Sequence, residues 1–132
     1  MFSLLAVLLI IFNSGDDIVI KDQWIRPGAE KMGTALYFTI QNNGSEADTL
    51  FAVETDNAKM VQIHETYSTG DVMGMREIGK INIEPGSSVK LEPGGKHIMV
   101  MRLKKDIKKG DEIEFKLHFQ KAGEISITAR AK

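Results

Sequence analysis

From residue 16 onward, apolar and polar positions alternate in short stretches instead of recurring at helical spacing. The stretches are rich in β-branched and aromatic residues, and turn residues interrupt them about every 8 to 12 positions. In residues 115–120, for example, the apolar side chains occupy the odd positions and the polar ones the even positions. The pattern predicts strands at 18–26, 34–42, 48–54, 58–67, 72–78, 88–91, 97–103, 112–120 and 124–130.

Turn residues mark the boundaries between the expected strands. Glycine, asparagine and proline, which supply positive φ angles or fixed corners, gather at 42–44, 84–86, 92–95, 109–111 and 122–123. Regular short strands with almost no helical signal predict an all-β fold, an antiparallel Greek-key sandwich or barrel. The 132 residues suit one domain with a real core, which we place at residues 16–132.

The amino end carries a different signal. Residues 2–12, FSLLAVLLIIF, form an apolar run that only Ser3 interrupts. This is the length of the apolar part of a secretion signal and shorter than the roughly 20 residues of a membrane span. We expect residues 1–15 to be a signal-peptide-like segment of a periplasmic or otherwise extracytoplasmic protein, with no stable membrane insertion of the domain. The alternative is a first buried strand.

Composition excludes several functions. A formal net charge of −1 provides no basic field for nucleic acid. The absence of cysteine excludes disulfides, a cysteine-based zinc site, a thiol nucleophile and a blue-copper centre. The sequence has no Gly-x-Ser-x-Gly elbow and no glycine-rich phosphate loop before a helix. We therefore expect a protein that is not an enzyme.

Histidine and methionine occupy unusual positions in three of the expected strands. In KHIMVM, residues 96–101, the histidine and both methionines share one face, and the β-branched residues take the other. His64 likewise has the parity opposite to its apolar neighbours, and so do the methionines in residues 72–75. A methionine that fills the core should share the face of its apolar neighbours. This parity disfavours core filling.

The donor atoms indicate which metal would suit such a group. Thioether sulfur is soft and neutral, so Ca²⁺, Mg²⁺ and Mn²⁺ are poor partners, whereas imidazole combined with thioether favours copper, above all Cu(I). A site made only of neutral ligands leaves the charge of the ion uncompensated. Such a site can lie near water and release its metal. The candidate donors are His64, Met75, His97 and Met99, with Met73 and Met101 sharing the parity of the methionines beside them.

The spacing of these four residues, H-x10-M-x21-H-x-M, resembles the signature of the PCuAC family of periplasmic copper chaperones. Three further segments resemble the family's recurring ones: DQWIRP at 22–27, ALYFTIQN at 35–42 and LEPGGKHIM at 91–99. The resemblance extends over residues 17–130. It implies a cupredoxin-like β-barrel that binds one Cu(I) near its surface through His64, Met75, His97 and Met99. Met73 and Met101 fall outside the signature and are interpreted as spare thioethers or packing.

The resemblance also implies a role. Members deliver copper without catalysis to the CuA centre of cytochrome c oxidase, alone or with a Sco-type copper protein, and we expect this chain to act as a monomer. Some relatives carry a His/Met-rich tail that binds Cu(II), which is not expected after Lys132. Two alternatives stay open. One is an exported copper-buffering or resistance protein without a specific client, and the other is a structural module whose His/Met cluster is accidental.

Overall fold

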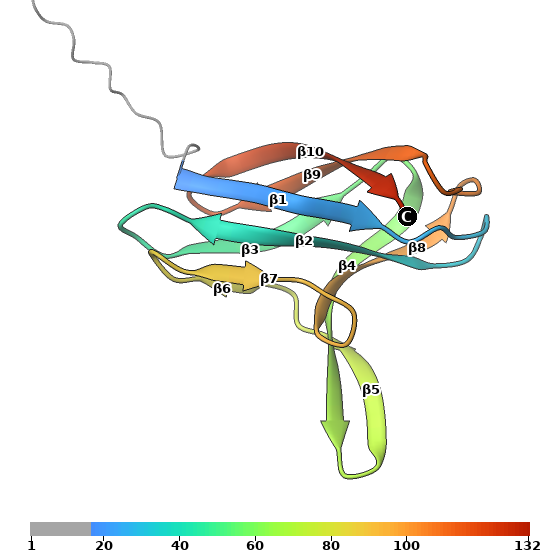
Figure 1. Ribbon diagram of the computed structural model, residues 1–132, viewed down its shortest axis with the longest axis horizontal. Coiled ribbons are helices and arrows are strands. Elements are labelled where there is room, and N and C mark those ends of the chain that lie inside the picture. The colour runs from blue at the N-terminus through green and yellow to red at the C-terminus, as the bar shows by residue number, and fades with distance from the viewer. Residues whose placement is uncertain (1–16) are drawn as a thin grey trace, which may run out of the picture.

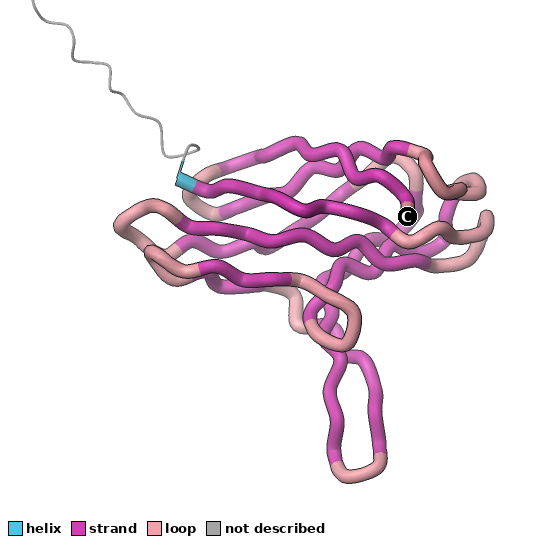
Figure 2. The backbone as a smooth tube through the Cα atoms, viewed as in Figure 1, coloured by secondary structure: helices cyan, strands magenta, loops and turns pink. Residues whose placement is uncertain are grey.

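The computed structural model describes residues 17–132 as a β-domain, and the expected signal-like segment at 1–15 lies outside the described residues. Figures 1 and 2 show that strands make up most of this part of the chain, with loops at their ends. Within it, no helix has the length and apolar character needed to cross a membrane. The strands are β1 (Ile18–Ile25), β2 (Thr34–Asn42), β3 (Asp48–Glu54), β4 (Ala58–Thr69), β5 (Val72–Glu77), β6 (Ile81–Ile83), β7 (Ser88–Lys90), β8 (Lys96–Leu103), β9 (Glu112–Phe119) and β10 (Gly123–Ala131).

The predicted strands are all present, with boundaries within two residues of those expected, and the all-β prediction is confirmed. The pattern missed β6. This strand has only three residues, with Ile81 and Ile83 buried and Asn82 exposed, so the alternation is real but too short to be recognised in sequence. It adds an edge strand next to β3.

The strands form one sheet in the order β5-β4-β8-β2-β1-β10-β9-β3-β6, and β7 pairs with β2. Strands that are consecutive in sequence are often apart in the sheet, as Greek-key connections require, and the sheet wraps around a shared core (Figure 1). β1 and β10 pair in parallel, which joins the two ends of the domain. Their apolar faces meet those of β2, β8 and β9 in one cluster of buried residues.

Alternation places the core on one face of each central strand. In β9, Ile113, Phe115, Leu117 and Phe119 are buried while the residues between them are exposed or half-buried. In β8, Ile98, Val100 and Leu103 belong to the core, and His97 is buried outside that apolar cluster. The face of β8 that carries His97 and Met99 is therefore directed away from the apolar core, as predicted.

The β4–β5 hairpin extends beyond the rest of the domain, and Figure 1 shows it projecting as an arm. The first part of β4 pairs with β8, and the later part pairs with β5. β5 buries none of its residues, and Val72 is 62% exposed. The expectation that Met73 and Met75 lie opposite a core-facing Val72 is therefore wrong, because this hairpin has no core to face. The conclusion that these methionines do not fill the core still holds.

A buried asparagine connects distant parts of the sheet. The Asn42 side chain donates from Nδ2 to the carbonyl oxygens of Glu46 (2.9 Å) and Ile83 (3.0 Å), and its Oδ1 accepts from the Gly44 N–H (2.9 Å). Asn42 is 1% exposed. These bonds fix β2 against β6 and the turn that follows β2, and water cannot replace them at low cost.

We therefore expect Asn42→Ala to lower the free energy of unfolding by about 1–3 kcal/mol, because it leaves buried backbone groups without partners. Asn43→Ala, at the exposed neighbouring position, is the matched control and should change it by less than about 0.5 kcal/mol. Urea denaturation followed by circular dichroism measures both. Equal effects of the two substitutions would contradict the role assigned to Asn42.

Candidate metal centre

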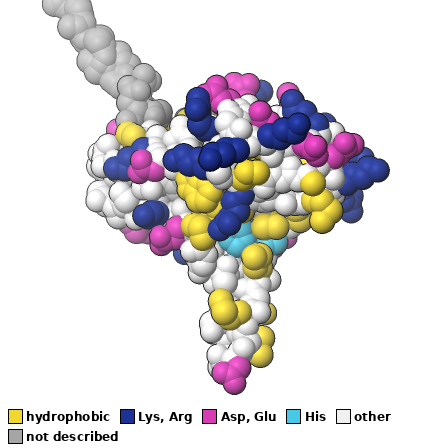
Figure 3. Space-filling view, turned by 45° about the vertical axis from the view of Figure 1, so that its right-hand side comes forward, with side chains coloured by type: hydrophobic (Ala, Val, Ile, Leu, Met, Phe, Trp, Pro, Cys, Tyr) yellow, Lys and Arg dark blue, Asp and Glu magenta, His cyan; other side chains and the backbone are white. Residues whose placement is uncertain are grey.

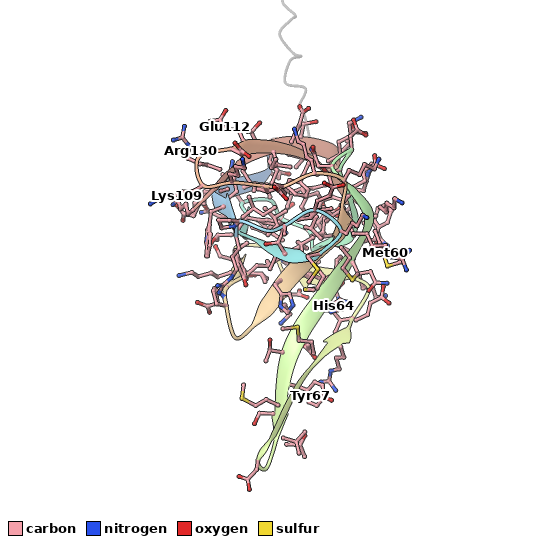
Figure 4. All side chains as sticks on the ribbon, turned by 90° about the vertical axis from the view of Figure 1, so that its right-hand side faces the viewer. Met60, His64, Tyr67, Lys109, Glu112 and Arg130 are labelled. Atoms are coloured by element: carbon pink, nitrogen blue, oxygen red, sulfur yellow. The ribbon has the colours of Figure 1, made fainter. Side chains whose placement is uncertain are left out.

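The pairing of β4 with β8 brings the two histidines of the predicted set together. His64 lies directly opposite His97 in this antiparallel ladder. Their ring centroids are 5.9 Å apart, with 57° between the ring planes. In Figure 4, His64 lies where the projecting hairpin joins the rest of the domain. The space-filling view shows histidine at the surface at this junction, next to hydrophobic side chains (Figure 3).

The two methionines of the set lie on the same face of the sheet. Met99 is opposite Gln62, and Met75 is opposite Thr66 on the other side of β4. Directly opposed residues point to the same side of a sheet, as do residues two apart along a strand. Gln62 and Thr66 are both two positions from His64. The four predicted residues therefore share one face across β8, β4 and β5, and Met75, His97 and Met99 line one open cleft.

Hydrogen bonds fix which nitrogen of each imidazole is free. His97 Nδ1 lies 3.1 Å from the carbonyl oxygen of Gly95, which can only accept, so Nδ1 carries the proton and Nε2 has the lone pair. His64 Nε2 lies 2.9 Å from Gln62 Oε1, also an acceptor, so the lone pair of His64 is on Nδ1. Within residues 17–132, His97 Nε2 and His64 Nδ1 are the buried side-chain nitrogen or oxygen atoms that have no hydrogen-bond partner.

Buried polar atoms without a hydrogen-bond partner are rare. In each of these histidines the other ring nitrogen is hydrogen-bonded to an oxygen acceptor, which resembles the arrangement that orients metal-binding imidazoles. Burial lowers the pKa of His64, the nearby His97 lowers it further, and Glu77 acts in the opposite direction. The lowered pKa favours the neutral ring, the form that binds metals.

In the described part of the chain, no three His, Cys, Asp or Glu side chains form a group that could hold a metal ion. The thioethers Met75 and Met99 line the cleft at His97 together with Tyr37, and Glu77 lies opposite His64 in the β4–β5 ladder.

The four side chains differ strongly in exposure. His97 is 3% exposed, Met99 and His64 are half-buried, and Met75 on the projecting hairpin is 59% exposed. The candidate site therefore extends from the buried imidazole of His97 to the solvent-exposed thioether of Met75. Met73, two residues from Met75 on the same face, is 71% exposed. The third histidine, His118, lies on β9, where its Nε2 is 3.2 Å from Glu54 Oε1.

An aromatic row supports His97 from the other side. Trp24 pairs with Tyr37 in the β1–β2 ladder, with ring centroids 4.8 Å apart, and Tyr37 lies 6.4 Å from the His97 ring. Arg26 donates from Nε to the Tyr37 hydroxyl at 3.2 Å, and its guanidinium lies over both the Trp24 and Tyr37 rings. The row places the Tyr37 ring beside His97 on the side of β2.

Sequence reasoning did not assign roles to Gln62, Tyr37 or the carbonyl of Gly95. A signal existed for Gln62, because it lies two positions before His64 and shares its parity. Tyr37 and Gly95 fall within segments that carried the family resemblance. Their contacts with the histidines depend on the pairing of distant strands, which the local pattern does not specify.

The family model described as "Putative lipoprotein LpqE-like" matches residues 18–131. A curated relative from Leifsonia xyli subsp. xyli, described as "Putative lipoprotein Lxx21020", is 30% identical over 108 residues, which cover 81% of this chain and 64% of the relative. A Rickettsia prowazekii protein described as "Uncharacterized protein RP573" is 29% identical over 119 residues, covering 81% of this chain and 66% of that protein. The chain thus spans about two thirds of the length of the curated relatives it matches.

Among solved structures, the copper-bound PCuAC domain of PmoF2 is similar to this chain. It is 28% identical, has a TM-score of 0.73, and the match covers 88% of this chain and 92% of that domain. The predicted resemblance to PCuAC domains and the predicted fold class are thereby confirmed.

Proposed function

Because this chain belongs to the LpqE-like family and is similar over most of its length to PCuAC domains, we propose that it is a Cu(I) carrier and not an enzyme. The single observation that supports this most strongly is the pair of buried, unpartnered imidazole nitrogens on adjacent strands. Both belong to the face that also carries the two thioethers of the predicted set. A similar PCuAC domain, that of PmoF2, has been solved with copper bound.

The proposed ligands are His64 Nδ1, His97 Nε2 and the sulfur atoms of Met75 and Met99. Two imidazoles and two thioethers form a neutral, soft donor set, which suits Cu(I) better than divalent oxygen-seeking ions. Gln62 and Gly95 accept hydrogen bonds from the second nitrogen of each histidine, which leaves the lone pairs of His64 Nδ1 and His97 Nε2 available to an ion. Copper stays in the +1 state throughout.

The gradient of exposure suggests the order of release. Met75 stands on the projecting hairpin in contact with water, whereas His97 is buried and oriented by Gly95 and Tyr37. A thiolate or imidazole of an acceptor protein can reach the ion from the Met75 side. The Cu–S bond to Met75 breaks first, as the bond from copper to the acceptor protein forms, and the bonds to the two histidines break last.

We further propose an extracytoplasmic location and a specific client. The family description and one curated relative both name lipoproteins, which supports export. The client proposed is the CuA-bearing subunit of cytochrome c oxidase, reached directly or through a Sco-type copper protein, with this chain acting as a monomer.

The ligand set predicts unequal effects of substitution on Cu(I) affinity. His97→Ala and Met75→Leu should each weaken binding at least about tenfold, which corresponds to about 1.4 kcal/mol, because each removes one donor. His118→Ala and Met32→Leu remove the same side-chain types elsewhere and should leave affinity unchanged. Competition with a colorimetric Cu(I) chelator measures the dissociation constant. The proposal fails if wild-type protein binds far less than one Cu(I), or if the site variants match their controls.

The client can be tested in cells grown at low copper. Deleting the gene should reduce cytochrome c oxidase activity, and copper supplementation should restore it. A gene encoding Met75→Leu with Met99→Leu should not complement the deletion, whereas one encoding Met32→Leu should. Normal oxidase activity combined with greater sensitivity to added copper would instead indicate a buffering protein without this client.

A further inference from the structure

A second group of thioethers lies beside the proposed carrier site. Met60 is directly opposite Met101 in the β4–β8 ladder, four residues along β4 from the His64–His97 pair. Met99 lies two residues before Met101 on the same face, opposite Gln62. We call Met60, Met99 and Met101 the thioether triad. Figure 4 shows Met60 and His64 at successive levels of β4, with Tyr67 further out on the hairpin.

The register brings the three side chains within reach of one ion. Directly opposed residues on one face have Cβ atoms about 4.5–5.5 Å apart, and the diagonal pair Met60–Met99 is about 7–8 Å apart. Methionine has three rotatable bonds, so its sulfur can move several ångströms from its Cβ. Gly33 lies beside Met101, and a Cβ there would be 3.7 Å from Met101 Cγ.

The positions of these residues are not explained by packing. Met60 is 38% exposed, and Met99 and Met101 are half-buried, all on the face of the sheet that points away from the apolar core. Polar residues normally occupy such a face. Three adjacent positions with flexible, soft, neutral donors are what a monovalent soft cation requires.

We propose that the thioether triad is a second binding site for a soft monovalent cation, Cu(I) or its analogue Ag(I). It differs from the carrier site in having only sulfur donors. It therefore binds more weakly and exchanges faster than a site that includes two imidazoles.

The two sites share Met99. This part of the proposal rests on the proposed function, because it takes Met99 as a ligand of the carrier site. An ion held by Met60, Met99 and Met101 passes to His97 and His64 without leaving the protein. The Met60 and Met101 bonds break as the two imidazole bonds form, while Met99 remains bound. The triad thereby gives the buried imidazoles a loading route from the side opposite the Met75 arm.

The test uses the full chain labelled with [methyl-¹³C]methionine and titrated with Ag(I), which is redox-inert, followed by NMR. Seven methionines give resolvable methyl signals. We expect a first equivalent to shift Met75 and Met99, and a second equivalent to shift Met60 and Met101, which hold the second ion as a two-coordinate pair once Met99 is bound at the carrier site. Met60→Leu with Met101→Leu should bind one equivalent fewer. The matched control, Met32→Leu with Met73→Leu, removes two exposed thioethers outside the triad and should keep both equivalents.

A His64→Ala, His97→Ala variant separates this proposal from the proposed function. If the carrier site is wrong but the triad is right, Met60 and Met101 still shift in this variant and in the wild type. If the carrier site is right but the triad is wrong, the wild type saturates at one equivalent and Met60 and Met101 do not move. Loss of the Met60 and Met101 shifts in the control variant would also overturn the triad. Unchanged backbone amide spectra show that each variant is folded.

Discussion

The antiparallel pairing of β4 with β8 is the constraint on which the site depends. It places His64 opposite His97, and it also sets the face on which Met99 lies. Ile63, Ile98 and Val100 fill the core from the other face of the same two strands. A slip of one residue would bury polar side chains and expose these apolar ones, so burial of the core holds the histidines in register. The packing energy of the domain is thus used to position imidazoles that do not belong to the core.

The remaining features divide the site into a fixed part and an accessible part. His97 is buried, hydrogen-bonded to the Gly95 carbonyl and next to Tyr37, so its ring is held in place by the fold. Met75 lies on β5, which buries none of its residues, and 59% of it is exposed. A carrier has to bind its cargo and also give it up. The fixed imidazoles suit the first task, and an exposed neutral thioether suits the second.

Local sequence patterns predicted the strands and the face of each donor because strand alternation is a local property. They missed β6, because a strand of three residues is too short to display an alternating pattern. They also indicated a core-facing Val72, because the pattern cannot distinguish a core strand from a hairpin that projects from the domain. Spacing alone could not show that Gln62 and Gly95 orient the histidines, because those contacts arise from strand pairing and turn geometry. The ligand set and the signal-like segment remain predictions.

The most direct measurement is X-ray absorption at the copper edge of the Cu(I)-loaded protein, at one equivalent of metal. The account predicts an edge typical of Cu(I) and a first shell of mixed nitrogen and sulfur, with two imidazoles and two thioethers. A shell containing only nitrogen and oxygen would contradict it, as would a first equivalent bound by sulfur alone.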